Sequence, residues 1–146
     1  MMGGSVHKAG LVLAFAVVGC VNGLIAFSGT LSDTVQHMPA AFGPVFSGLD
    51  GVSGPLQEPP IKDKHLCKNV TNESNRLLYN GSIVFVPRGG CQFGVKITNA
   101  MMQGAKGVVV YNEEQRRMSY DAVVRMSAEN LPDADSINIP SVFISF

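Results

Sequence analysis

Cys67, Cys91 and His65 are the side chains whose types and spacing could do chemistry in this 146-residue sequence. A thiol beside a histidine would make a nucleophile and its base, and two thiols with an imidazole supply three zinc ligands. His65 is not part of a CxxC or HxxxH spacing, which disfavours zinc. In an oxidising compartment the cysteines would form one disulfide, closing a loop of about 25 residues and stabilising the fold by on the order of 3 kcal/mol. The disulfide needs the fewest assumptions, and two free buried thiols are the alternative.

Other catalytic and ligand-binding patterns are missing from the sequence. No serine lies in a G-x-S-x-G elbow. Gly89-Gly90 precedes a helical pattern but belongs to neither a G-x-x-x-x-G-K nor a G-x-G-x-x-G loop. The acidic residues Asp121, Glu129, Asp133 and Asp135 do not follow EF-hand spacing. We therefore expect no catalytic residue, no metal and no cofactor in this chain.

The charge balance excludes two classes of partner. The sequence has 11 Lys and Arg against 11 Asp and Glu, a net charge of zero, and it has no basic block. Nucleic acids and anionic membrane surfaces are bound through a positive footprint. We expect neither as a partner.

The N-terminus has the three-part plan of a secretory signal. One positive charge in Met1–Lys8 precedes the apolar run Leu11–Val21, and small or polar residues follow up to Ser28. The run of 11 residues is short for a membrane span, which needs about 20. We predict a signal peptide over residues 1–26, cleaved after Gly23 or Ala26.

Two alternatives to this signal are an uncleaved anchor over Ala9–Phe27 and, ranked lowest, a lipid-attachment box ending at Cys20. Cleavage would remove Cys20 and leave an even number of cysteines, as an oxidising lumen favours. Three Asn-X-Ser/Thr sequons, at Asn69, Asn72 and Asn80, also favour the secretory pathway, because N-linked sugars are added there. Asn80 is followed by Gly81 in a predicted tight turn, so we expect glycans first at Asn69 and Asn72.

The rest of the chain has two parts, an entry segment and a main domain. Residues 27–60 are rich in glycine and proline, yet they carry enough apolar side chains to pack on the domain that follows. The main domain covers residues 61–146 and begins with a polar excursion over 62–82. A second polar stretch, 112–138, is too long for a simple loop, and we expect a helical turn or two over Tyr120–Glu129.

The clearest structure lies between these excursions. Ile83–Val86 is a buried strand closed by Pro87, and Gly107–Tyr111 is a second one. Apolar residues from Phe93 onward recur at helical spacing, which predicts a helix of about three turns with Gly104 at its C′ position. Strand, helix and strand should form a right-handed βαβ unit with parallel strands. A last strand follows Pro140 and runs to Phe146, so we expect the domain to be incomplete at its C-terminus.

Several motifs in one order resemble the protease-associated (PA) domain. They are Pro87-Arg88-Gly89-Gly90-Cys91-Gln92-Phe93, Lys96, Asn99-Ala100, Gly104-Ala105-Lys106, Val108–Asn112 and Ile139-Pro140-Ser141-Val142-Phe143-Ile144-Ser145. Upstream, Met38–Gly43, Gly48–Gly51 and the lone Cys67 are similar to the luminal PA domain of PA-TM-RING ubiquitin ligases.

This resemblance implies an α+β fold, a β-barrel-like sandwich with flanking helices. It assigns structural roles to Arg88, Gly89, Gly90, Phe93, Gly104 and Pro140; for Arg88, bonding to nearby carbonyls is favoured over a functional role. It also implies a non-catalytic domain of the secretory pathway, luminal or extracellular, that binds a protein or peptide. In the PA-TM-RING ligases a membrane span and a cytoplasmic RING follow. This chain has no CxxC pair for RING zinc and cannot itself transfer ubiquitin.

Two other roles fit the same resemblance. The chain could be an accessory domain of a secreted peptidase, or a stand-alone secreted PA protein with a sorting-receptor-like role. We favour the ligase because the signal lies so close to the domain. Membrane attachment would come from a C-terminal span or from an uncleaved N-terminal anchor.

Overall fold

The computed structural model describes seven parts of the chain: residues 14–17, 25–28, 37–44, 52–68, 78–113, 124–127 and 131–144. Within the segment predicted to be the signal, β1 (Ala14–Val17) pairs antiparallel with β2 (Ile25–Ser28), which extends just beyond it. This pairing does not test cleavage, which stays a prediction. The sequons at Asn69 and Asn72 lie outside the described residues.

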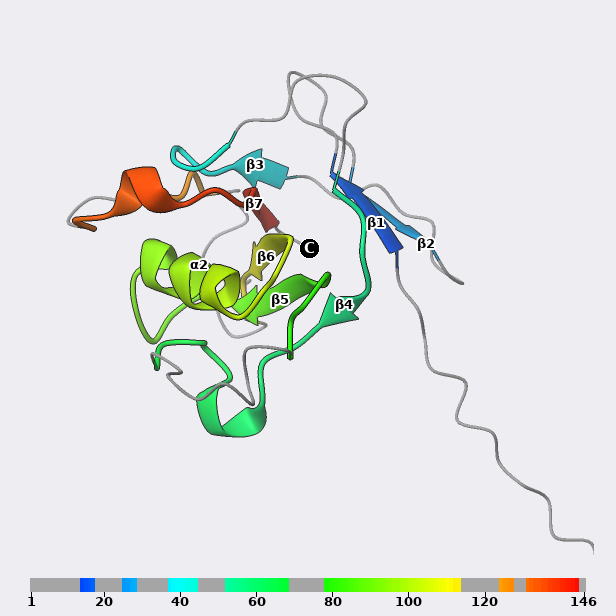
Figure 1. The fold of residues 1–146 in the computed structure, drawn as a ribbon, viewed down its shortest axis with the longest axis horizontal. Coiled ribbons are helices and arrows are strands. Elements are labelled where there is room, and N and C mark those ends of the chain that lie inside the picture. The colour runs from blue at the N-terminus through cyan, green and yellow to red at the C-terminus, as the bar shows by residue number, and fades with distance from the viewer. Residues whose placement is uncertain are drawn as a thin grey trace, which may run out of the picture.

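A mixed sheet of five strands forms the centre of the molecule, in the order β3-β7-β6-β5-β4 (Figure 1). Three strands, β4, β5 and β6, run parallel to one another, β7 runs parallel to β6, and β3 at the edge runs antiparallel to β7. The strands are β3 (His37–Pro39), β4 (Leu56–Gln57), β5 (Ile83–Pro87), β6 (Gly107–Tyr111) and β7 (Ser141–Ile144). The described residues therefore form a mixed sheet of five strands, which agrees with the predicted class of a fold that combines helix and strand.

Helix α2 (Phe93–Met102) connects β5 to β6, and the two strands it joins are parallel neighbours. Its end has the predicted glycine: Gly104 takes a φ of +84°, in the region that only glycine enters without strain. The N–H of Gly104 donates to Met101 O at 3.0 Å, and that of Ala105 to Ala100 O at 3.1 Å. This pair of bonds is a Schellman motif, which satisfies the last carbonyls of the helix.

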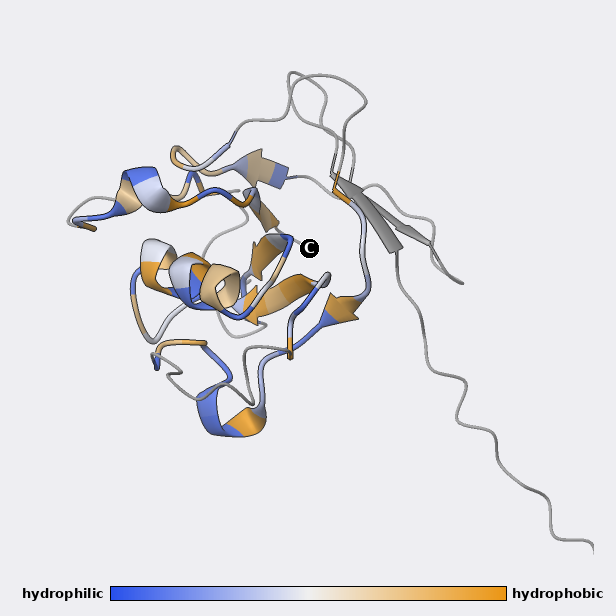
Figure 2. Ribbon diagram, viewed as in Figure 1, coloured by the Kyte–Doolittle hydropathy of each residue, from blue (hydrophilic) through white to orange (hydrophobic). Residues whose placement is uncertain are grey.

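Both faces of the sheet are packed, which explains why its strands are continuous apolar runs. Because side chains alternate along a strand, Val84 and Val86 point to one face and Ile83 to the other. The face toward α2 contains a core cluster with Val84, Val86, Val110, Phe143 and the helical Ile97. The opposite face contains a smaller cluster of Ile83, Val109, Val142 and Ile144. Figure 2 shows the hydrophobic strands at the centre and more hydrophilic connecting segments around them.

The polar stretch that follows β6 differs from the prediction where it is described. No helix forms over residues 124–127, although a helical turn was expected there. Met126 is fully buried, and its carbonyl accepts a hydrogen bond from Ala41 N–H at 2.9 Å. This contact with the N-terminal part of the chain uses a backbone oxygen that a helix would need. A short 3-10 helix, η2 (Ala134–Ser136), occurs later in this stretch, and another, η1 (Ile61–Asp63), lies before β5.

Within the described parts of the chain, none of the helices combines the length and the apolar character that a bilayer crossing requires.

Candidate functional site

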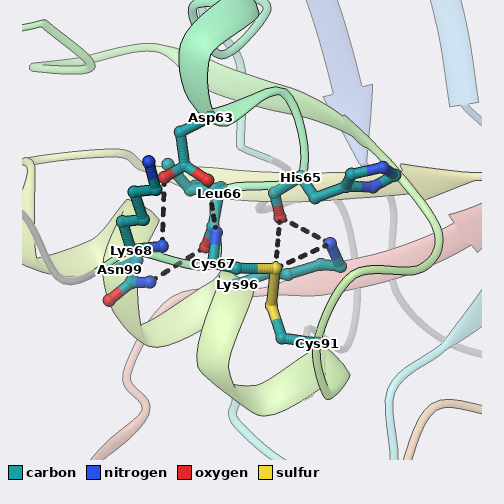
Figure 3. The surroundings of a disulfide bond; sticks show 8 residues. All are labelled: Asp63, His65, Leu66, Cys67, Lys68, Cys91, Lys96 and Asn99. Carbon is teal, nitrogen blue, oxygen red and sulfur yellow. Dashed lines mark hydrogen bonds between the residues drawn. A yellow bond between two sulfur atoms is a disulfide. The ribbon is translucent and has the colours of Figure 1, made fainter.

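A loop formed by residues 61–68 lies against α2 and is joined to it by a disulfide (Figure 3). We call this segment the docked loop. Cys67 in the loop and Cys91 just before the helix have their sulfurs 2.12 Å apart and their Cα atoms 5.7 Å apart. The structure therefore joins Cys67 and Cys91 in the predicted disulfide. Neither cysteine is left as a free thiol that could form a dyad with His65. Among the residues that the structure describes, no group of three or more His, Cys, Asp or Glu is placed to hold a metal.

Asp63 closes the docked loop on itself. One carboxylate oxygen accepts the Cys67 N–H at 2.9 Å and the other accepts the Lys68 N–H at 3.1 Å. The main-chain oxygen of Asp63 accepts the Leu66 N–H at 2.8 Å. Two backbone donors bonded to one side chain fix the turn, as Asp does at many loop starts.

Leu66 is the residue that inserts the docked loop into the core. It is 1% exposed and has a φ of +53°, a left-handed conformation that L-residues avoid. This conformation costs roughly 1–2 kcal/mol, whereas burial of a leucine side chain contributes about 1.5–3 kcal/mol. Burial is the larger effect, so the strained conformation is retained.

Two polar side chains one helical turn apart on α2 hold the loop's backbone. Asn99 Nδ2 donates to Leu66 O at 2.9 Å, and Lys96 Nζ donates to His65 O. Lys96 Nζ also lies 3.9 Å from Cys67 Sγ. Because residues three apart share a helix face, three consecutive loop residues are fixed to one stripe of α2.

Lys96 is a charged group in the core. Its side chain is 0% exposed. Burial lowers the pKa of Lys96 from 10.5 to about 8, while the charges of Asp63 and Glu113 act in the opposite direction. Glu113 itself forms a salt bridge of 2.8 Å with Lys64 of the docked loop. Since desolvation disfavours the ammonium, Lys96 binds the loop at an energetic cost that the nearby carboxylates partly offset.

The predicted glycine turn before α2 is required by close approach. Gly89 and Gly90 have φ values of +106° and +78°. A Cβ on Gly90 would lie 2.8 Å from the Cβ of His65 and 3.0 Å from Cys67 Sγ. The docked loop therefore packs directly on a backbone that has no room for a side chain.

The other residues of the predicted motif, Phe93, Pro140 and Arg88, make contacts that support the fold. Phe93 packs edge-to-face on Phe143, with ring centroids 6.2 Å apart. Pro140 is buried, and its carbonyl accepts the Val108 N–H at 3.0 Å at the start of β7. Arg88 continues the β5–β6 pairing through its N–H, which donates to Tyr111 O at 2.8 Å, and its side chain is half-buried.

Asn80 is exposed in the turn before β5, and Gly81 beside it has the positive φ, +76°, that the turn prediction requires. Its attachment of sugar stays a prediction.

Sequence reasoning gave no role to Lys96, Asn99 or Tyr79. Tyr79 is 0% exposed, and burial raises its pKa to about 12, with Asp63 as the second cause. A signal existed for the first two: Lys96 and Asn99 stand at i and i+3 beside the apolar stripe of Ile97 and Ala100. Polar residues next to the buried face of a helix often bind a neighbouring backbone.

Comparisons with known proteins identify the family. The sequence model of the PA domain matches residues 52–146. A receptor homology region, transmembrane domain- and RING domain-containing protein 3 of Arabidopsis thaliana is 29% identical over 126 residues, covering 83% of this chain and 26% of that protein. The E3 ubiquitin-protein ligase RNF13 of Homo sapiens is 30% identical over 125 residues, covering 77% of this chain and 28% of the ligase. The chain thus spans about a quarter of the length of these relatives.

A solved structure supports the fold. The zinc aminopeptidase BSAP from Bacillus subtilis superposes on 92% of this chain, and on 28% of its own, with a TM-score of 0.56 at 18% identity. Such low identity concerns the fold alone. With a family match over residues 52–146 that contains the disulfide, the glycine turn, α2 and β7, this chain belongs to the PA domain family.

Proposed function

We propose that this chain is a non-catalytic binding domain that recruits a protein or peptide, and that it serves a membrane-bound RING-type E3 ubiquitin ligase. The observation that carries the binding role is the docked loop, which is fixed to α2 yet presents Ile61 with 95% of its surface exposed. The ligase role is supported by the relatives, one of which is a transmembrane and RING domain-containing protein and another an E3 ubiquitin-protein ligase.

The docked loop has the properties of a recognition surface. Ile61, Lys62 and Lys68 are exposed. The disulfide and the bonds from Lys96 and Asn99 hold the loop in place before a partner arrives. A preorganised loop loses little conformational entropy on binding, so more of the contact energy appears as affinity. An exposed isoleucine beside lysines favours a peptide that has an apolar side chain next to an acidic one.

The remaining parts of the proposal concern the whole domain and its location. The full fold would be the β-barrel-like sandwich with flanking helices that the family resemblance implies. The domain would face the lumen of the secretory pathway or the outside of the cell, after removal of residues 1–26, with sugar on Asn69, Asn72 or Asn80. The Cys67–Cys91 bond supports this location, since such bonds persist in oxidising compartments.

A photo-crosslinking amino acid tests the binding role. It replaces Ile61 in one protein and Met102, an apolar residue 51% exposed on α2, in the matched control, both expressed in the secretory pathway. We expect a discrete crosslinked protein from position 61 and none from position 102. The same crosslink should be lost when Lys62 and Lys68 are changed to Glu. Equal labelling from the two positions would contradict recognition by the docked loop.

The transcript beyond the codon for Phe146 tests the ligase role separately. We expect an apolar span of about 20 residues and then a Cys/His zinc pattern. A peptidase sequence in that place would contradict the ligase role and leave the binding role intact.

A further inference from the structure

The two sulfurs of the Cys67–Cys91 bond have different surroundings. Cys67 Sγ lies 3.9 Å from Lys96 Nζ, and the lysine side chain is 0% exposed. Cys91 belongs to the glycine turn, where its neighbours Gly90 and Gln92 are both exposed. The Cys67 sulfur therefore lies beside a buried cation, whereas Cys91 belongs to a turn whose neighbouring residues are exposed (Figure 3).

The cation decides which sulfur leaves more readily. When a disulfide is attacked, the departing sulfur carries a negative charge, and the departing thiol of lower pKa leaves faster. A buried ammonium within 4 Å stabilises a thiolate at Cys67. The N-terminus of α2 would favour a thiolate at Cys91, but it offers only about half a unit charge. Cys91 also precedes the N-cap residue Gln92, which is exposed to water. The full buried charge has the larger effect.

Access favours the same direction. A thiolate attacks a disulfide in line with the S–S bond, from behind the sulfur to which it bonds. Behind Cys67, the carbonyl oxygen of His65 lies 3.5 Å from Sγ, on the side away from Cys91 (Figure 3). Attack on Cys67 is therefore obstructed by a backbone oxygen. Cys91 lies between the exposed residues Gly90 and Gln92, and we expect an incoming thiolate to reach it from this side.

We propose that the Cys67–Cys91 bond is a thiol–disulfide exchange site with one direction, in which an incoming thiol is attached to Cys91 and Cys67 is released toward Lys96. The co-reactant is a small thiol or a protein dithiol. Its thiolate sulfur forms a bond to Cys91 Sγ, the Cys67–Cys91 bond breaks, and the electron pair leaves with Cys67 as a thiolate. The Cys67 thiolate can then attack Cys91, which expels the thiol and restores the original bond.

The docked loop keeps several contacts in the mixed disulfide. The Asp63 turn and the bonds from Lys96 and Asn99 to the loop carbonyls do not involve sulfur. The modified protein is therefore folded, and Cys91 carries the adduct at the edge of the docked loop.

Limited exchange with glutathione, a small thiol probe, tests the direction. The oxidised protein is exposed to glutathione at neutral pH, quenched with acid, and blocked with N-ethylmaleimide before non-reducing digestion and mass spectrometry. We expect glutathione on Cys91 and maleimide on Cys67 in roughly tenfold excess over the reverse pattern. An excess of the reverse pattern, equal amounts, or no adduct in the folded protein would overturn the proposal.

Two lysine variants test the cause. Lys96→Met should reduce the excess toward one, while Lys106→Met, at an exposed lysine just after α2, should leave it unchanged. A full excess in Lys96→Met would overturn the role of the cation. If Lys96→Met does not fold, the wild-type adduct pattern alone decides the direction, and Lys96→Arg, which keeps the charge, should retain the excess.

Discussion

The β5–β6 strand pair and the docked loop are held by different kinds of force. The strand pair is in register from Ile83 opposite Gly107 to Pro87 opposite Tyr111, and most of its side chains are buried. In the docked loop only Leu66 is buried. Besides the burial of Leu66, the position of the docked loop depends on one covalent bond, one carboxylate and two side chains of α2.

This difference separates what each region responds to. Apolar burial stabilises the strands and is insensitive to moderate changes of pH or thiol concentration. The docked loop depends on groups that can be reduced, titrated or removed one at a time. A substitution in the sheet should therefore lower global stability, and one in the loop contacts should first release the loop.

The largest effect is expected in the sheet. Phe143→Ala removes a ring that is 0% exposed and packs on Phe93. We expect the free energy of unfolding, measured with urea, to fall by about 3–5 kcal/mol. Met102→Ala, at a half-exposed position, is the control and should change it by less than about 0.5 kcal/mol. A similar loss in both variants would contradict the picture of a packed sheet.

Removal of the disulfide should have the next largest effect. We expect Cys67→Ala with Cys91→Ala to lower the free energy of unfolding by about 3 kcal/mol through loop entropy. Hydrogen exchange should become faster at the amides of residues 67 and 68, while the exchange rates in β5 and β6 should change much less. If exchange rose equally in the strands and the loop, the two regions would not be independent.

Asn99→Ala isolates one polar contact. It leaves the Leu66 carbonyl without the donor that now lies 2.9 Å away, and we expect a loss of about 1–3 kcal/mol. Asn138→Ala, at an exposed asparagine, should be near neutral. Chemical denaturation measures the loss, and a shift of the Leu66 amide in NMR spectra locates it. An unchanged docked loop in Asn99→Ala would show that the disulfide alone holds it.

The smallest predicted effect is a dependence on pH. Because burial lowers the pKa of Lys96 to about 8, from 10.5 when unfolded, the unfolded chain binds the proton more tightly between these values. The free energy of unfolding should therefore rise from pH 8 to pH 10, by on the order of 1–2 kcal/mol.

Lys96→Met should abolish this rise, and Lys106→Met should retain it. The measurement should stop at pH 10, because above it the ionisation of Tyr79 changes the free energy of unfolding in the opposite direction. Burial raises the pKa of Tyr79 to about 12, so its contribution to stability is lost as the pH rises above 10. A rise that persists in Lys96→Met would assign it to another group.

Local patterns were sufficient for the elements between Ile83 and Tyr111. Runs of β-branched residues predicted β5 and β6, and the helical period from Phe93 with Gly104 after it predicted α2 and its end. These elements are specified by neighbours in the sequence. The disulfide could be proposed from the cysteine count alone, without knowledge of what surrounds it.

The contacts of the docked loop could not be predicted in the same way. Lys96 is separated from His65 by 31 residues, and its burial follows from tertiary packing that overrides the usual exposure of lysine. The positive φ of Leu66 has no local signal, since leucine seldom adopts it. The helical turn expected around Met126 was wrong over residues 124–127, because a backbone bond to Ala41 takes its place.

The antiparallel pairing of β3 with β7 has a consequence for synthesis. His37 lies opposite Ile144, so one strand leaves the ribosome about a hundred residues before its partner, roughly 5–20 s at ordinary rates of elongation. The segments β5, α2 and β6 are made within that interval, so they are available as a contiguous unit before β7 emerges. The edge strand made first is thus the one that completes the sheet last, and chaperones in the cell have those seconds in which to bind it.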